Sequence, residues 1–66
     1  MHKLPNPGDR VRVPFGIGIH ILEGEVLRAS DFGIGPLVMV AVDVEGSDEP
    51  INVTYDLDDV EIASVA

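Results

Sequence analysis

Carboxylates are the side chains of this sequence best suited to chemistry, and they gather in two short clusters. The first cluster is Asp43, Glu45, Asp48 and Glu49, and the second is Asp56, Asp58 and Asp59. Clustered carboxylate oxygens suit Ca²⁺, but the first cluster lacks the spacing of a Ca²⁺-binding loop and its flanking helices. We therefore expect a solvated hairpin tip and a charged turn. The alternative is that both clusters join as one acidic face for a basic protein partner.

Groups for catalysis or for cofactor binding do not form a recognisable set. The sequence has no cysteine, which excludes disulfides, cysteine-based zinc sites and thiol catalysis. His2 and His20 have no nucleophile or matched ligand set near them in the sequence. A dinucleotide-binding fingerprint that starts at Gly16 would need a glycine where Ile21 stands. We therefore predict that the protein is not an enzyme and that it binds no metal or cofactor.

A repeated apolar tetrapeptide is the least expected local feature. Phe-Gly-Ile-Gly stands at residues 15–18 and again at residues 32–35. Surface loops are normally polar, so two apolar loop tips would mark an interface with a protein partner or with a second copy of the chain. The residues predicted for this surface are Phe15, Ile17, Ile19, Phe32, Ile34 and Tyr55. A second interpretation stays open, in which both phenylalanines fold inward and the glycines only form turns.

The charge of the chain is strongly negative and unevenly distributed. The net charge is −8; residues 1–28 hold all four basic side chains and three carboxylates, and residues 29–66 hold nine carboxylates and no Lys or Arg. Binding to DNA or RNA relies on Lys and Arg at the phosphates, so direct nucleic-acid binding is disfavoured. An anionic membrane surface is disfavoured for the same reason. Acidity also keeps a small apolar domain in solution.

The length of 66 residues allows one domain with a small core. Small domains often need a disulfide, a metal or self-association, and the sequence leaves self-association as the remaining stabiliser. No stretch approaches the roughly 20 apolar residues of a membrane span, and the first eight residues contain no apolar signal core. We expect a soluble cytoplasmic protein.

Short strands separated by turns account for most of the sequence. Alternating apolar and polar residues predict strands at residues 9–14, 22–29, 51–55 and 60–62, and an apolar run predicts one at 37–42. Residues 6–9 predict a turn, and residues 56–59 predict a single 3₁₀ turn before the last strand. The run at 37–42 is apolar on both faces, which predicts the central, most buried strand. Gly24 predicts either a bulge or a close backbone approach.

This order of elements and three motifs resemble the SH3-like β-barrels. The motifs are Gly-Asp-Arg-Val-Arg-Val at residues 8–13, Glu-Gly-Glu-Val at 23–26 and Leu-Asp-Asp-Val-Glu-Ile at 57–62. The first two are similar to the variable chain of ferredoxin–thioredoxin reductase, a non-catalytic partner of an iron–sulfur subunit. The resemblance implies an all-β, five-stranded SH3-like barrel over residues 8–63. We expect a flexible N-terminal segment at 1–7 and a tail at 64–66.

The predicted function is a non-enzymatic protein-interaction module or accessory subunit that self-associates. The alternative is an acidic regulator that mimics nucleic acid and occupies a basic site on a DNA- or RNA-handling protein. Ionic strength separates the two, because salt weakens binding by an acidic face and hardly changes apolar docking. A third possibility is an enzyme whose pocket forms only in the shared pore of a symmetric oligomer.

Overall fold

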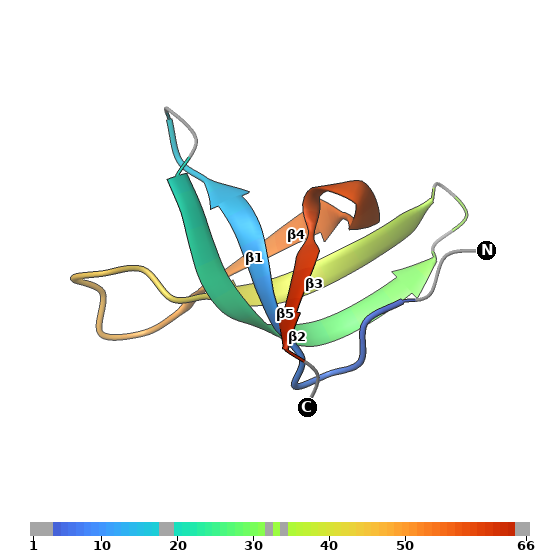
Figure 1. The fold of residues 1–66 in the computed structure, drawn as a ribbon, viewed down its shortest axis with the longest axis horizontal. Helices are drawn as coiled ribbons and strands as arrows, with labels where there is room; N and C mark the ends of the chain where they lie inside the picture. Colours follow the sequence, from blue (N-terminus) through green and yellow to red (C-terminus); the bar gives the residue numbers. More distant parts are fainter. Residues whose placement is uncertain (1–3, 18–19, 32, 34, 65–66) are drawn as a thin grey trace.

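The computed structural model describes residues 4–17, 20–31, 33 and 35–64, and these residues form one antiparallel sheet (Figure 1). The described elements are β1 (Arg10–Phe15), β2 (His20–Asp31), β3 (Pro36–Val42), β4 (Ile51–Asp56), the 3₁₀ turn η1 (Leu57–Asp59) and β5 (Glu61–Ser64). The predicted all-β class, the five strands and the 3₁₀ turn before the last strand are confirmed. Within the described residues the sheet does not close into a barrel, because β4 and β5 are its two edges.

The strand order is β4-β3-β2-β1-β5, which puts β2 at the centre of the sheet. The prediction that residues 37–42 form the central strand is wrong, because β5 returns to pair with β1 and extends the sheet on that side. The sheet is also strongly curled. The hydroxyl of Tyr55 on β4 donates a hydrogen bond to the carbonyl oxygen of Pro14 on β1 at 2.8 Å, although β2 and β3 lie between these strands in the ladder.

Six valines form the core, and they belong to β1, β2 and β3. Each is no more than 1% exposed: Val11, Val13, Val26, Val38, Val40 and Val42. Alternate residues of a strand share a face, and β-branched side chains pack well on a sheet, so the alternation in the sequence accounts for this core. Half-buried side chains from the first hairpin, from β4 and from η1 pack against it, among them Phe15, Tyr55 and Leu57.

The second face of β3 is only partly covered. Leu37 is half-buried, Met39 is 40% exposed and Ala41 is buried. The prediction that this is the most buried strand is confirmed, but Met39 leaves its second face partly exposed. The physical reason is that the described residues form one sheet, with no second layer over this face.

Close packing between β2 and β3 explains why residue 24 is a glycine. A Cβ atom on Gly24 would lie 2.6 Å from the carbonyl oxygen of Ala41 and 2.6 Å from Cγ1 of Val40. The predicted close backbone approach is therefore confirmed. The bulge in this strand lies further along, because the register between β2 and β3 shifts between Val26 and Arg28.

The predicted turn at residues 6–9 is confirmed, and it ties the start of the chain to β2. The N–H of Asp9 donates to the carbonyl oxygen of Asn6 at 3.0 Å, and the N–H of Asn6 donates to Oδ2 of Asp9 at 2.9 Å. The N–H of Gly8 donates to the carbonyl oxygen of Val26 at 2.9 Å. Pro5, just before the turn, is buried. The N-terminal segment thus packs onto the sheet from residue 5 onward.

Candidate functional site

The predicted apolar surface is divided by the fold. Phe15 is half-buried against the valine core, Tyr55 is half-buried with its hydroxyl bonded to Pro14, and Ile17 is fully exposed, at 101%. The remaining predicted members, Ile19, Phe32 and Ile34, lie outside the described residues. In the first copy of the tetrapeptide the phenylalanine thus packs inward and the isoleucine is exposed to solvent.

The turn end of the β1–β2 hairpin is the clearest exposed apolar region that the structure describes. We call it the hairpin tip, and it consists of residues 14–17 and 20–21. Ile17 is joined there by Ile21, which is 61% exposed and pairs with Pro14 in the ladder. None of these residues carries a carboxylate, although the whole chain has a net charge of −8. Ile21 lies next to the predicted surface in the sequence, and its neighbour Leu22 packs against the core.

Tyr55 connects the hairpin tip to β4. Its hydroxyl donates to the carbonyl oxygen of Pro14 from across the curled sheet. Desolvation by burial raises the pKa of Tyr55, because the phenolate is less well solvated there than the neutral phenol. A neutral phenol is also the form that can donate this hydrogen bond. Tyr55 therefore acts as a structural tie beneath the hairpin tip.

The first acidic cluster lies on the loop between β3 and β4. All four of its carboxylates, Asp43, Glu45, Asp48 and Glu49, are exposed. The loop borders a hollow of about 390 Å³ that reaches Pro50. It is held together locally by the hydroxyl of Ser47, which donates to the carbonyl oxygen of Glu49 at 2.6 Å. Among the described residues, no three His, Cys, Asp or Glu side chains lie close enough together to hold a metal ion.

The second acidic cluster surrounds η1, at the opposite end of β4 from the loop (Figure 1). Asp56, Asp58 and Asp59 are all exposed. The six residues of β4 separate the two clusters, which corresponds to about 20 Å of extended chain. The structure therefore brings the clusters to the two ends of one strand and does not merge them into a single patch.

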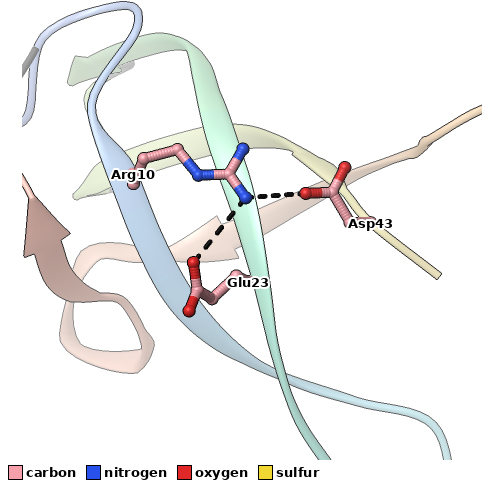
Figure 2. A network of polar contacts seen from close by, with 3 residues as sticks. All are labelled: Arg10, Glu23 and Asp43. Carbon is pink, nitrogen blue, oxygen red and sulfur yellow. Dashed lines mark hydrogen bonds and ion pairs between the residues drawn. The ribbon is translucent and has the colours of Figure 1, made fainter. Parts of the chain in front are cut away.

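An ion-pair network around Arg10 partly neutralises the negative charge of the first cluster (Figure 2). Nη2 of Arg10 lies 2.7 Å from Oδ2 of Asp43 and 3.7 Å from Oε1 of Glu23. The hydrogen bond with Asp43 is the main cause that raises the pKa of Arg10; desolvation opposes it, and the charges of Asp43, Glu23 and Glu25 add to it. On the neighbouring pair of strands, Nη1 of Arg12 lies 3.0 Å from Oε1 of Glu61. Two basic residues of the first half of the sequence thus neutralise carboxylates of the second half.

The outer face of the sheet carries a second hollow, of about 260 Å³. It is lined by Arg28, Ser30, Leu37, Met39 and Thr54. Its apolar floor comes from the half-covered face of β3 described above. Sequence reasoning missed this hollow because it treated the whole apolar run as core.

Comparison of the chain with protein-family models, with curated proteins and with solved structures yields no match. In the part of the chain that the structure describes, no helix is both long and apolar enough to cross a membrane. Any functional proposal for this chain therefore rests on the geometry of the hairpin tip, of β4 and of the acidic clusters.

Proposed function

We propose that the chain is a non-enzymatic protein-interaction module or accessory subunit of the cytoplasm, which docks onto a partner protein or a second copy through its hairpin tip. The observation that carries this proposal is the exposure of Ile17, at 101%, and of Ile21, at 61%. Exposed apolar side chains that gather in one region mark protein–protein interfaces, and both isoleucines belong to the same end of one hairpin. The carboxylate-free sequence of the tip also allows close approach of a second acidic copy, since like charges stay distant there.

We extend this proposal to the fold and take the chain as an SH3-like barrel. Three features support it: the order β4-β3-β2-β1-β5, the 3₁₀ turn between the last two strands and the bond from Tyr55 to Pro14 across the curled sheet. Such a barrel would position the hairpin tip at one end of a rigid frame. The fold itself carries no functional argument, because one small barrel serves many roles.

The oligomeric state tests the self-associating form of the proposal. We expect the wild-type chain to exceed its monomer mass of 7.1 kDa in sedimentation experiments. The double variant Ile17→Ser/Ile21→Ser should return it to the monomer mass while circular dichroism shows that the chain stays folded, with a lower unfolding midpoint because the stabilisation by association is lost. A matched control is Ile62→Ser, which removes an isoleucine that is 44% exposed on β5. An oligomer that survives the double variant contradicts docking through the hairpin tip.

Site-specific photo-cross-linking tests the partner-binding form. A photoreactive residue in place of Ile17 should link the chain to one defined protein in its native cell, and Ile21→Ser should abolish that link. The same photoreactive residue at position 62 serves as the control. Equal cross-linking from both positions, or a link that persists in Ile21→Ser, counts against the proposal.

The second candidate function is an acidic regulator that occupies a basic site on a nucleic-acid-handling protein. The observation in its favour is that all seven carboxylates of the two clusters are exposed. Binding of this kind should weaken steeply as ionic strength rises. Docking through the hairpin tip should change little under the same conditions, so a salt titration of any complex distinguishes the two functions.

A further inference from the structure

The outer edge of β4 is an open strand edge. Among the described residues, β4 pairs with β3 and with no other strand. None of the backbone hydrogen bonds found outside the regular ladders involves a residue of β4. An antiparallel edge strand directs every second N–H and C=O away from the sheet, so this edge presents a row of backbone groups that can pair with another extended chain.

The two edges of the sheet differ in how far they prevent such pairing. β5 is four residues long, carries the ion-paired Glu61, and shifts register against β1 between Arg10 and Val11. Short length, charge and irregularity are the usual protections of a sheet edge. β4 is six residues long, pairs with β3 in an unbroken register, and has no charged residue before Asp56 at its end. The edge of β4 therefore lacks the protections that the edge of β5 has.

The core is also incompletely covered on the side of β4. No residue of β4 is buried. Val53 lies opposite Val40, which is 0% exposed, yet Val53 itself is only half-buried. Ile51, two residues before it on the same face, is 41% exposed. One more strand beside β4 would cover both side chains, as β2 covers β3 on its other flank.

We infer that β4 accepts an extended segment of a partner protein that has an uncharged centre and basic residues at both ends. Charge complementarity identifies this occupant. The loop with Asp48 and Glu49 lies just before β4, and η1 with Asp58 and Asp59 lies just after it (Figure 1). A strand added to β4 would hydrogen-bond along the uncharged residues 51–55, and each of its ends would reach one acidic cluster. Strand addition of this kind obtains affinity from main-chain hydrogen bonds and specificity from the flanking side chains.

A second copy of the chain fits this edge less well, for an electrostatic reason. Antiparallel pairing of two β4 strands about Val53 would place Pro50 of one copy opposite Asp56 of the other. The acidic loop of each copy would then lie beside η1 of the other, with like charges meeting at both ends of the shared ladder. A basic-ended segment turns the same two contacts into attraction.

A synthetic peptide tests this inference with the intact chain. The probe has a six-residue core of alternating Val and Thr with two lysines at each end, and its binding is followed by fluorescence anisotropy of a terminal label. We expect binding that weakens severalfold as salt is raised to physiological ionic strength. A peptide with glutamates in place of the lysines, and one N-methylated at all core residues, should both fail to bind. Binding by either of these peptides overturns the inference.

Charge variants locate the contact on the protein. Asp48→Asn/Glu49→Gln and Asp58→Asn/Asp59→Asn should each weaken peptide binding severalfold, since all four carboxylates are exposed and their loss leaves the core intact. The control variant, Glu23→Gln/Glu25→Gln, removes the same net charge from β2 and should leave binding nearly unchanged. Equal losses of peptide binding in all three variants would mean that the net charge of the protein, and not the position of the carboxylates, controls binding. That result would overturn the inference.

Amide hydrogen exchange identifies the bound strand. The probe peptide should slow exchange at residues 52–56, and it should leave the amides of β5 unaffected. Protection at β5 or at the hairpin tip, or a salt-strengthened dimer that excludes the peptide, rejects this occupant of β4. The inference is separable from docking through the hairpin tip, because Ile17→Ser/Ile21→Ser should not alter peptide binding.

Discussion

The two flanks of β3 show how differently one strand can be packed on its two sides. Toward β2 the backbones approach so closely that residue 24 has no room for a Cβ atom. Toward β4 the neighbouring side chains remain partly in water, and Val53 is half-buried opposite the fully buried Val40. Both flanks have continuous antiparallel pairing beside these residues, so the backbone ladder alone does not explain the difference.

The difference lies in what covers each flank. β2 is itself followed by β1 and β5, and these strands curl over the core, whereas β4 has no strand beyond it among the described residues. Burial of apolar surface supplies most of the stabilising free energy of a small domain. The stability of this chain therefore lies mainly in β1, β2 and β3, and β4 is the part that remains available for binding. The predictions below test this division.

The largest expected effect comes from adding one methyl group on the well-packed flank. Gly24→Ala places a Cβ atom 2.6 Å from backbone oxygen and from a core methyl group. The backbone of β3 cannot move aside cheaply, so we expect a loss of about 3 kcal/mol in the free energy of unfolding. The total free energy of unfolding of a domain of this size is about 3–10 kcal/mol. A large shift of the urea unfolding transition to lower denaturant concentration, followed by circular dichroism, is therefore the expected result.

Gly16→Ala is the matched control for this substitution. Gly16 has a positive φ of 80°, but apart from its two chain neighbours no atom of the described residues lies within 4 Å of the position that its Cβ would take. Its cost is limited to backbone strain of about 1–2 kcal/mol. If Gly24→Ala proves no worse than Gly16→Ala, then the close packing between β2 and β3 does not limit stability.

A pair of valines on neighbouring strands, Val40 and Val53, allows a direct comparison of the buried core with the β4 flank. Val40→Ala removes two methyl groups from a side chain that is 0% exposed, and we expect it to cost about 2–3 kcal/mol. Val53→Ala removes the same atoms from its half-buried partner across the ladder. It should cost about 1 kcal/mol, since water already contacts this site. Urea midpoints of the two variants at equal m-values measure the difference, and equal costs would contradict the division of the sheet.

The features of the fold that the sequence predicted correctly are those set by local chemistry. Alternation around Val11 and Val13 predicted the core face, because side chains of a strand alternate whatever the rest of the chain does. Gly24 predicted a close approach, and residues 56–59 predicted the 3₁₀ turn. The position of β2 at the centre was missed, because it depends on β5 pairing with β1 some 50 residues away in the sequence. The exposure of Met39 was missed because it depends on whether a second layer covers that face, and none does among the residues that the structure describes.

The features of the candidate site also fall into those that local sequence predicts and those that depend on the fold. Ile17 could be singled out from its apolar loop sequence, and the two acidic clusters could be read directly. The separation of those clusters by the length of β4 and the pairing of Arg10 with Asp43, which is 33 residues distant, required the three-dimensional arrangement. The open edge of β4 could not be predicted either, since an edge is defined by the strand that is missing beside it.

Tyr55 provides a smaller test on the β4 flank. Tyr55→Phe removes the hydrogen bond to the carbonyl oxygen of Pro14, and we expect a loss of about 1 kcal/mol at neutral pH. The pKa of Tyr55 is raised above its ordinary value of 10.0 by burial. Ionisation therefore begins first in the unfolded chain, and the contribution of Tyr55 is full below pH 10 and falls as the pH rises toward the folded pKa.

The pH dependence can be measured cleanly because Tyr55 is the only tyrosine of the chain. Tyrosinate absorbance of the folded protein should titrate above the unfolded value, and urea midpoints of the wild type should fall above pH 10. Tyr55→Phe should flatten that decline. A wild-type decline that is unchanged in the variant would assign it to other groups and leave Tyr55 as packing alone.

The smallest expected effect is on the surface ion pairs of the well-packed side. Asp43 follows directly after β3 and accepts from Arg10 of β1 at 2.7 Å, whereas Glu23 of β2 lies 3.7 Å from the same guanidinium (Figure 2). All three side chains are well exposed, so water screens these contacts and each is worth about 0.2–1 kcal/mol. Asp43→Asn should therefore lower stability slightly more than Glu23→Gln, because only Asp43 makes a hydrogen bond. Both differences should shrink in high salt. A larger loss for Glu23→Gln would mean that the charge of Glu23, rather than the bond to Asp43, holds Arg10 in place, and that the end of β3 is fixed by its backbone ladder alone.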